Sequence, residues 1–256
     1  MTANSAALQL YTLRDQMTVG RAEVLAHVAA LGYGAVEPFG ILADPDGLRA
    51  ELDATGLSVC SVHAEPTGED AEAVVRAART LGADTVIIPY LPPSRFADAE
   101  SVRALARELN ELGAWTAGQG LRLGYHNHDF ELSSLVGGIP ALEVLADQLD
   151  DTVLLEVDTY WAAVGGQDVP ALLRRLSDRV RYLHVKDGPV VNRDDFMTAV
   201  GSGRMPVAEI LAASPSAQWH VVELDRCATD MMTAVGDSLA WLASQGLARP
   251  RRTSAH

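Results

Sequence analysis

The stretch VLLEVDTYWAAVGGQDVPALLRRLSDRVRYLHVK, residues 153–186, contains the pattern that decides the fold. Two short runs rich in Val, Leu and Tyr, Val153–Tyr160 and Val180–Lys186, have the composition of buried strands. Between them, Val169–Leu176 has the apolar spacing of a helix. A strand, a helix and a second strand in this order predict two parallel strands joined by a crossover helix.

The same alternation extends along the whole chain. Six more strands are expected at Ala7–Leu13, Ala35–Phe39, Ser58–Ala64, Thr85–Tyr90, Arg122–His128 and Trp219–Leu224. Further helices are expected at Arg21–Leu31, Ala71–Leu81, Ser101–Trp115, Pro140–Leu149, Pro206–Ala213 and Asp230–Ser244. Several helices end in a glycine stop, at Gly32, Gly56 and Gly82. Eight strand–helix units predict an α/β fold, a single (β/α)₈ TIM barrel; the marker of the rival doubly wound sheet, Gly-x-Gly-x-x-Gly after the first strand, is absent.

Length and composition agree with a single domain. The chain has 256 residues, and a lone barrel typically needs about 250. Hydrophobic residues make up 48% and charged residues 21%, which is enough apolar material for a large core. We expect the barrel to span residues 1–248, and residues 249–256 to form a basic, flexible tail.

Several classes of function are disfavoured by the composition. The formal net charge of −14 would repel a nucleic-acid backbone. The sequence has no apolar run of roughly 18 residues and no start resembling a secretory signal. Two cysteines, Cys60 and Cys227, are too few for a disulfide framework. We therefore expect a cytoplasmic protein that binds neither nucleic acid nor membrane.

Ionisable side chains recur where the expected strands end. In a barrel of this kind, catalytic groups project from the carboxyl ends of strands. Because a strand alternates faces at every residue, each of three pairs shares a face. These pairs are His126 with His128, Glu156 with Asp158, and His184 with Lys186. Glu37, His63 and Glu223 stand at the ends of three other strands.

Converging carboxylates and imidazoles are costly to bury unless they are paired or bind a metal. A mixed shell of these ligands suits Mn²⁺, Mg²⁺, Co²⁺ or Zn²⁺. Structural roles are the alternative for each residue alone. Asp158 could cap a helix, His184 could be a hydrogen-bonded core histidine, Glu223 could pair with an arginine, and Lys186 could neutralise Asp187 or Glu156.

The chain resembles the xylose isomerase-like superfamily of sugar phosphate isomerases and epimerases over nearly its whole length. The resembling segments are LQLYTLRD, YGAVEPFG, LGYHNHDFEL, LLEVDTYWAAVGG, VRYLHVKDG, VGSGRMPVAEIL and HVVELD. The resemblance implies one divalent metal held by Asp158, His184, Glu223 and a ligand from the fifth strand. Tyr125 stands where the first strand-five glutamate of the epimerases is expected, and Glu131 matches the second. Glu131 is therefore the expected fourth ligand, with His128 as the alternative.

The implied activity is metal-dependent isomerisation or epimerisation of a keto-sugar, polyol or sugar phosphate through α-proton abstraction and an enediolate. His128, His126 or Glu131 would be the base, and Lys186 would balance charge. Glu37, His63 and Trp161 would line the sugar pocket. The HNHDFE signature departs from the epimerase pattern and looks more like inosose dehydratases and keto-glycoside lyases, so a lyase or dehydratase is the alternative.

Arg204, in the sequence Gly201-Ser202-Gly203-Arg204, is a candidate for binding an anionic group of the substrate. The simpler interpretation of this sequence is a turn before the helix that starts at Pro206.

Two other functions fit the fold. A metal-dependent DNA-repair endonuclease shares the superfamily, but it would need a basic face and a multi-metal cluster. A non-catalytic sugar-binding subunit of a hetero-oligomer would not need the set Asp158, His184 and Glu223. Small-molecule sugar is the expected partner, and a homodimer or hetero-oligomer is the expected assembly.

Overall fold

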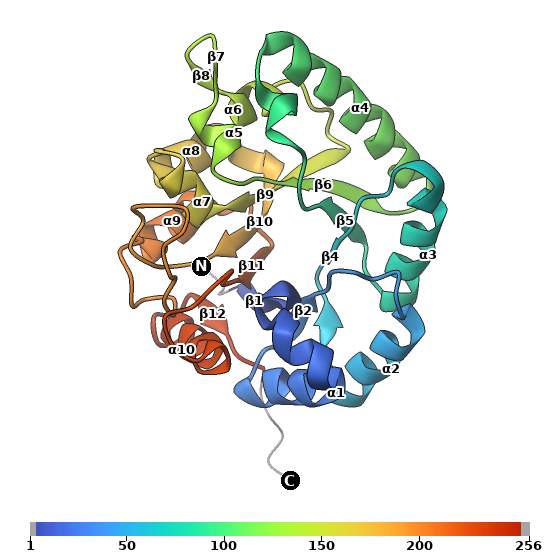
Figure 1. Cartoon of the computed structure of the whole chain (residues 1–256), viewed down its shortest axis with the longest axis vertical. Helices are drawn as coiled ribbons and strands as arrows, with labels where there is room; N and C mark the ends of the chain where they lie inside the picture. Colours follow the sequence, from blue (N-terminus) through green and yellow to red (C-terminus); the bar gives the residue numbers. More distant parts are fainter. Residues whose placement is uncertain (1–3, 252–256) are drawn as a thin grey trace.

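The barrel strands form one parallel sheet that closes on itself (Figure 1). The computed structural model describes residues 4–251. The strand order is β3-β2-β1-β11-β10-β9-β6-β5-β4. These strands are β1 (Asn4–Gln9), β2 (Ala35–Glu37), β3 (Ser58–Val59), β4 (Val62–His63), β5 (Thr85–Ile88), β6 (Arg122–His126), β9 (Val153–Asp158), β10 (Val180–Val185) and β11 (Trp219–Val222).

The chain itself closes the ring. The first and last strands of the order, β3 and β4, are consecutive pieces of one segment that is interrupted at Cys60 and Ser61. A parallel bridge between Phe39 and His63 also joins β4 to the segment that follows β2. Counting β3 and β4 as one position, the barrel has the eight strand positions that the sequence predicts, and the prediction of a TIM barrel is confirmed.

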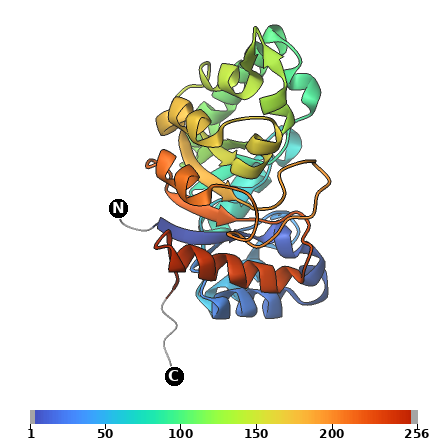
Figure 2. The ribbon, with the colours of Figure 1, turned by 90° about the vertical axis from the view of Figure 1, so that its left-hand side faces the viewer.

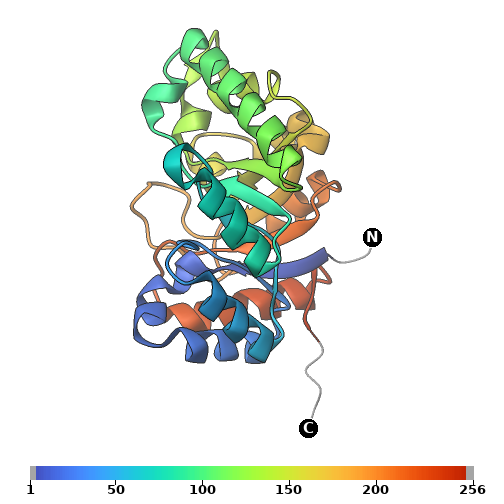
Figure 3. The ribbon, with the colours of Figure 1, turned by 90° about the vertical axis from the view of Figure 1, so that its right-hand side faces the viewer.

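Helices surround the barrel, as the two side views show (Figures 2 and 3). The α-helices are α1 (Arg14–Leu31), α2 (Pro45–Thr55), α3 (Ala71–Leu81), α4 (Ala99–Gly118), α5 (Phe130–Ser133), α6 (Ala141–Ala146), α7 (Thr159–Val164), α8 (Val169–Leu176), α9 (Val207–Ala213) and α10 (Met231–Ser244). Helix α10 packs beside α1, so the first and last of these helices are neighbours. Outside the barrel, β7 (Leu135–Val136) and β8 (Ile139–Pro140) form a small antiparallel hairpin.

The predicted glycine stops are present. Helices α1, α2 and α3 end at Gly32, Gly56 and Gly82, whose φ angles of 104°, 65° and 77° lie in the left-handed region. Glycine adopts this conformation without the steric cost that a Cβ would add. The boundaries of α3 and α8 agree with the prediction at both ends.

An apolar layer fills the interior of the barrel. It consists of Ala7, Ala35, Cys60, Ile87, Leu154, Tyr182 and Val221. On β6 the corresponding position is Gly124, where a Cβ would lie 2.7 Å from Leu154 Cδ1 and 3.0 Å from Ile87 Cγ1. Because side chains alternate along a strand, the next inward positions lie two residues further on. Those positions carry the polar groups of the site.

Each of the eight predicted strands ends one to four residues earlier than the sequence predicts. Strand β1 stops at Gln9, whose side chain accepts a hydrogen bond from the Tyr11 amide, and a 3₁₀ turn follows at Leu10–Leu13. Helix α1 then begins at Arg14 rather than Arg21, with a non-helical residue at Gly20. Strands β6 and β9 stop at His126 and Asp158, two residues before their predicted ends.

The described part of the basic tail packs on the barrel. Strand β12 (Ala248–Arg249) pairs with β1. The Arg251 guanidinium donates to the carbonyl oxygens of Thr55 and Gly56. Residues 249–251 of the expected tail thus contact the barrel, and residues 252–256 lie outside the described residues. Within residues 4–251, none of the helices has the length and apolar character needed to cross a membrane.

Candidate active site

Polar side chains occupy the inward positions two residues beyond the apolar layer. Alternation from Gly124, Leu154 and Tyr182 leads to His126, Glu156 and His184, and Glu223 follows Val221 in the same way. One further step leads to Asp158 on β9, Lys186 after β10 and Asp225 after β11. The alternation of the strands therefore gathers two layers of ionisable groups at the carboxyl end of the barrel.

The deeper layer is a set of histidines around two glutamates. Three ring nitrogens, Nε2 of His63, Nδ1 of His126 and Nε2 of His184, lie 2.7, 3.0 and 3.1 Å from Oε2 of Glu156. On the other side of this layer, Glu37 Oε2 lies 2.7 Å from His184 Nε2. Gln9 Nε2 and the Ser61 hydroxyl also donate to Glu37.

The upper layer is organised by Lys186. Its Nζ lies 2.8 Å from Asp158 Oδ2, 2.7 Å from Glu223 Oε2 and 2.6 Å from Asp225 Oδ2. The other oxygen of Asp158 accepts a hydrogen bond from the Trp161 amide and caps helix α7. Asp158 therefore has the helix-capping role and also faces the site.

Burial and charge shift the pKa values of these groups in opposite directions. Burial alone would lower the pKa of His184, but the carboxylates of Glu156, Glu223 and Glu37 raise it well above its usual value. Burial likewise opposes the charge of Lys186, yet Asp158, Asp225 and Glu223 raise its pKa. The pKa of Asp158 rises to about 6 because burial outweighs the attraction of Lys186. Ionised Lys186 and protonated His184 thus offset part of the negative charge of the carboxylates.

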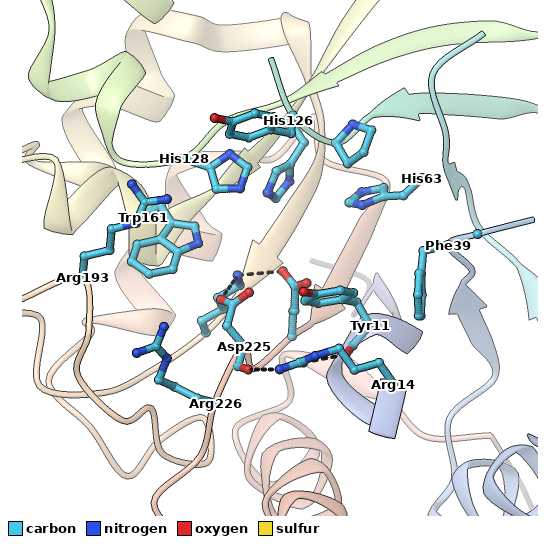
Figure 4. Close-up of a pocket in the computed structure, with 15 residues that line it drawn as sticks. Tyr11, Arg14, Phe39, His63, His126, His128, Trp161, Arg193, Asp225 and Arg226 are labelled. Carbon is cyan, nitrogen blue, oxygen red and sulfur yellow. Dashed lines mark hydrogen bonds and ion pairs between the residues drawn. The ribbon is translucent and has the colours of Figure 1, made fainter. Parts of the chain in front are cut away.

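A pocket of about 550 Å³ opens above these layers (Figure 4). His63, His126 and His128 lie together on one side of it, with Trp161 and Arg193 next to them and Tyr11 and Phe39 opposite. The remaining lining residues are Arg14, Gly40, Pro89, Tyr90, Lys186, Glu223, Asp225 and Arg226. The pocket thus has aromatic walls and charged groups at several points, as a site for a small polar substrate requires.

His128 presents a neutral imidazole to this pocket. Burial and, to a smaller extent, the positive charge of Lys186 lower its pKa to about 4. Its ring stacks on Phe130 and meets the edge of Tyr90. Its buried Nδ1 has no hydrogen-bond partner among residues 4–251. An imidazole that is neutral at physiological pH is able to accept a proton.

Most of the residues singled out in the sequence reach the site. His63, His126, His128, Trp161, Lys186 and Glu223 line the pocket, and Asp158 and His184 lie directly beneath it. Glu37 belongs to the deeper layer and is fully buried, so it contacts other side chains rather than the pocket that it was expected to line.

Glu131 and Arg204 do not reach the site. Glu131 is fully buried, and its two oxygens accept hydrogen bonds from Tyr125 Oη and the His128 amide, at 2.6 and 2.9 Å. The strand-five residue that joins the histidine and carboxylate cluster is His126 instead. Arg204 lines a separate depression.

The amides of the loop around Arg204 have an internal partner. Those of Gly201 and Gly203 donate to the Asp187 carboxylate rather than facing an open anion site. The structure therefore agrees with the interpretation of this loop as a turn.

Other pocket residues were not selected from the sequence. Tyr11 and Arg14 follow the shortened first strand, and Tyr90, Arg193 and Arg226 come from loops. Asp225 carried a signal, because it lies two residues after Glu223, directly after an expected strand.

The donor set fits a divalent metal. Two groups of described residues offer ligand atoms that all lie within 4.8 Å of one another. The inner group is His63, His126, Glu156 and His184, and the outer group is His126, Asp158, His184 and Glu223. Glu156 Oε1 is buried without a hydrogen-bond partner among the described residues, so a bound cation could satisfy it. Imidazole with carboxylate suits Mn²⁺, Co²⁺ or Zn²⁺.

Fold and site together define a barrel with a buried cluster able to bind a metal beneath a polar pocket. A sequence model described as "Xylose isomerase-like TIM barrel" matches residues 25–245, and the chain belongs to this family. The inosose dehydratase of Geobacillus kaustophilus is 27% identical over 217 residues, covering 72% of this chain and 70% of that protein. The inosose dehydratase of Clostridium perfringens is 32% identical over 89 residues, which cover 34% of this chain and 29% of that protein.

Solved structures show the same fold. A sugar phosphate isomerase/epimerase from Parabacteroides distasonis matches with a TM-score of 0.79 and 24% identity, covering 97% of this chain and 96% of the other. A probable 3-DHS dehydratase from Bacillus anthracis matches with a TM-score of 0.74 and 11% identity, covering 93% and 98%. The family and its relatives are therefore enzymes of the isomerase, epimerase and dehydratase types.

Proposed function

We propose that this protein is a metal-dependent dehydratase of a keto-polyol or keto-sugar. It removes the proton next to the carbonyl and then expels a hydroxyl group from the neighbouring carbon. The observation that carries the proposal is the pairing of a neutral imidazole, His128, with an ammonium group, Lys186, on the same pocket. One can take a proton, and the other can stabilise the negative charge that results.

His128 is the base in this proposal. Its imidazole lines the pocket and is neutral at physiological pH because burial and Lys186 both lower its pKa, to about 4. Contacts with Tyr90 and Phe130 hold the ring in place, which favours a fixed geometry for proton transfer. Negative charge that develops on the substrate would raise the proton affinity of this histidine during the reaction.

Lys186 lies at the floor of the pocket, held there by three carboxylates. Its ammonium has three N–H donors, so donation to an enediolate oxygen replaces one of these ion pairs while the other two hold its position. Trp161 offers an aromatic wall for the C–H face of a polyol ring. A divalent ion held by residues of the inner or outer group would polarise the substrate carbonyl and stabilise charge on its oxygen.

Dehydration is favoured over epimerisation by the position of Glu131. Epimerases of the resembling type use two glutamates, and Glu131 matches the second. Here Glu131 is fully buried and hydrogen-bonded to Tyr125 and His128. The similarity to inosose dehydratases over most of the chain supports the same choice. Isomerisation or epimerisation, expected first from the sequence, becomes the second candidate. The carboxylates that line the pocket and remain available for it are Glu223 and Asp225.

The test is incubation of the metal-loaded chain with a keto-inositol in deuterated water, followed by NMR. Elimination gives an unsaturated ketone with near-ultraviolet absorption, which is the expected result. Solvent exchange at the α-carbon without elimination would favour the isomerase or epimerase. Absence of both exchange and elimination with any keto-polyol or keto-sugar would contradict the proposal.

The matched variant is His128→Gln, which keeps a polar side chain but cannot act as the base. It should lower kcat/KM by about 10²–10⁴-fold. Its metal content should equal that of the wild type, because His128 belongs to neither ligand group.

A further inference from the structure

The lining of the pocket carries more cations than carboxylates, although the chain as a whole has a formal net charge of −14. The lining cations are Arg14, Lys186, Arg193 and Arg226, and the lining carboxylates are Glu223 and Asp225. Both carboxylates lie within 2.7 Å of Lys186 Nζ. The three arginines therefore have no counter-ion among the residues that line the pocket.

Arg14 is fixed at the pocket by neutral groups rather than by a carboxylate. Its guanidinium donates to the backbone carbonyl oxygens of Tyr11 and Asp225, at 2.9 Å each, and lies 4.3 Å from the centre of the Tyr11 ring. Within residues 4–251 it forms no ion pair. The nearby Asp225 carboxylate is bound to Lys186 instead, at 2.6 Å. The position of Arg14 is thus determined while its charge has no counter-ion.

The guanidinium of Arg14 keeps donors for a ligand. Its two hydrogen bonds occupy two of the five N–H groups that a guanidinium offers. The side chain is partly exposed and lines the pocket. Figure 4 shows it beneath Tyr11 and directed toward Asp225, with His128 on the far side of the pocket. A planar guanidinium that is already held in place pairs with a carboxylate or a phosphate at little cost in side-chain entropy.

The other two arginines are held less firmly. Arg193 lies 3.1 Å from Asp129 and Arg226 lies 3.3 Å from Asp194, and neither aspartate lines the pocket. The arginine side chains are 53% and 44% exposed, and exposed ion pairs of this kind contribute little. These two arginines attract an anion toward the pocket, whereas Arg14 supplies a fixed contact.

We infer that the substrate carries an anionic substituent, a carboxylate or a phosphate, which Arg14 binds while the reacting part of the substrate lies beside His128 and Lys186. The inference rests on the proposed function for the position of the reacting carbons. Because Arg14 and His128 lie on opposite sides of the pocket (Figure 4), the anionic group is attached away from the carbon that loses the proton. A pocket of about 550 Å³ accommodates a sugar-sized ring with such a substituent.

This assignment makes Arg14 a residue that determines substrate specificity. A neutral keto-inositol then reacts with a higher KM than a substrate that has the same ring and an anionic group. The alternative is a purely structural role, in which Arg14 only joins the start of α1 to the segment after β11 through its two carbonyl contacts. A structural role predicts no difference between neutral and anionic ligands.

The experiment measures the binding of three unreactive probes to the metal-loaded full chain by calorimetry. Glucose, glucuronate and glucose 6-phosphate share a ring and differ at C6, which carries a hydroxyl, a carboxylate oxygen pair or a phosphate ester. At least one of the two anions should bind about tenfold more tightly than glucose at low ionic strength, and added salt should reduce this preference. The anion that binds more tightly identifies the substituent as a carboxylate or a phosphate.

Variants assign the preference to Arg14. Arg14→Gln should abolish it and leave the affinity for glucose unchanged. Arg14→Lys keeps the charge without the planar fork and should reduce the preference by about threefold. Arg76→Gln, at an exposed arginine of α3 outside the pocket lining, is the control for loss of one positive charge and should bind all three probes as the wild type does. If melting curves show that Arg14→Gln fails to fold, the result for Arg14→Lys decides.

Three results would overturn the inference. The first is equal binding of the three probes by the wild type, or no measurable binding of any. The second is a preference that persists in Arg14→Gln, because the metal or the other arginines would then hold the anion. The third is equal weakening of all three probes in Arg14→Gln, which indicates the structural role.

Elimination is measured separately, so the inference and the proposed function can fail independently. Elimination of water from a keto-inositol by a chain without anion preference overturns only this inference. A preference that depends on Arg14, in a chain that eliminates water from neither neutral nor anionic keto-polyols, overturns only the proposed reaction.

Discussion

Glu131 is a buried carboxylate whose environment favours its neutral form. Burial raises its pKa from 4.5 to about 7, although the hydrogen bonds from Tyr125 and His128 act in the other direction. At pH values between these two pKa values, Glu131 is protonated in the folded chain and ionised in the unfolded chain. The free energy of unfolding therefore decreases as the pH rises from about 4.5 through 7, by an amount on the order of 3 kcal/mol.

Glu131→Gln should remove this pH dependence, because the amide is neutral at every pH. The difference in unfolding free energy between variant and wild type should be larger at pH 8 than at pH 5, in favour of the variant, by about 2–3 kcal/mol. Urea unfolding at the two pH values measures it, with the exposed Glu69→Gln as a control for the change in net charge. Metal content should not change; loss of metal in this variant would restore Glu131 as a ligand.

The histidines, carboxylates and lysine of the site that the sequence could predict lie in strands or within two residues of a strand's carboxyl end. Alternation correctly paired His126 with His128, Glu156 with Asp158, and His184 with Lys186. Alternation alone could not show whether Tyr125 or its neighbours face the interior of the barrel. The structure shows this through Gly124, whose neighbours Leu154 and Ile87 are in the barrel interior; Tyr125 then faces outward, against Phe96. Glu131, the expected fourth ligand, lies in α5, beyond the end of β6, and belongs to neither ligand group.

At the scale of elements, Asp187 organises the long loop between β10 and α9, which projects from one end of the barrel (Figures 2 and 3). Its carboxylate accepts hydrogen bonds from the amides of Gly188, Gly201, Gly203 and Met205. There is no room for a side chain at residue 203, since a Cβ there would lie 2.1 Å from Asp187 Oδ1. The same loop carries Arg193 to the pocket, so Asp187 connects the structure of the loop to the wall of the pocket.

Asp187→Ala should leave several backbone amides without an acceptor and reduce the free energy of unfolding by about 2–4 kcal/mol. The KM for substrate should also rise, because the loop that holds Arg193 loses its anchor. Chemical unfolding and steady-state kinetics measure the two effects. Asp187→Asn keeps one acceptor oxygen and should show a smaller loss. Equal stability of Asp187→Ala and wild type would show that water replaces the carboxylate without cost.

The boundaries of elements were harder to predict than their existence. Val169–Leu176 and Ala71–Leu81 were predicted at both ends, because an apolar periodicity and a start or stop residue coincide there. The first strand was predicted to reach Leu13 because Leu10 and Leu13 are apolar, but they pack as a 3₁₀ turn in the core. Composition alone does not distinguish a buried turn from a buried strand.

At the scale of the whole molecule, eight repeated units predicted the barrel, but its closure depends on details that periodicity does not contain. The break at Cys60 and Ser61 divides one expected strand into β3 and β4, which pair with different neighbours. The packing of Arg251 against Thr55 and Gly56 joins residues almost 200 positions apart in sequence. Such long-range contacts form only when the chain is folded, and no local pattern in the sequence predicts them.

The cluster beneath the pocket draws on most of the barrel. Its histidines and carboxylates come from β2, β4, β6, β9, β10 and the end of β11. A cation bound there has no equivalent site in the unfolded chain, so its binding free energy adds to the stability of the fold. At a free metal concentration of 100 times the Kd, the gain is about 2.7 kcal/mol, which corresponds to a rise in Tm of roughly 5–10 °C for a chain of this size.

Thermal unfolding of the chelator-treated chain with increasing Zn²⁺ or Co²⁺ measures this gain. The Tm should increase with the logarithm of metal concentration above the Kd and return to its starting value when chelator is added. Ca²⁺ should have little effect, because it prefers oxygen ligands and the cluster is rich in imidazole. If no divalent ion moved the Tm, the buried charges would have to be balanced by protons and Lys186 alone. The carboxylates of Glu156, Glu223 and Glu37, which raise the pKa of His184, would then keep its imidazole protonated, and this positive charge would stabilise the cluster.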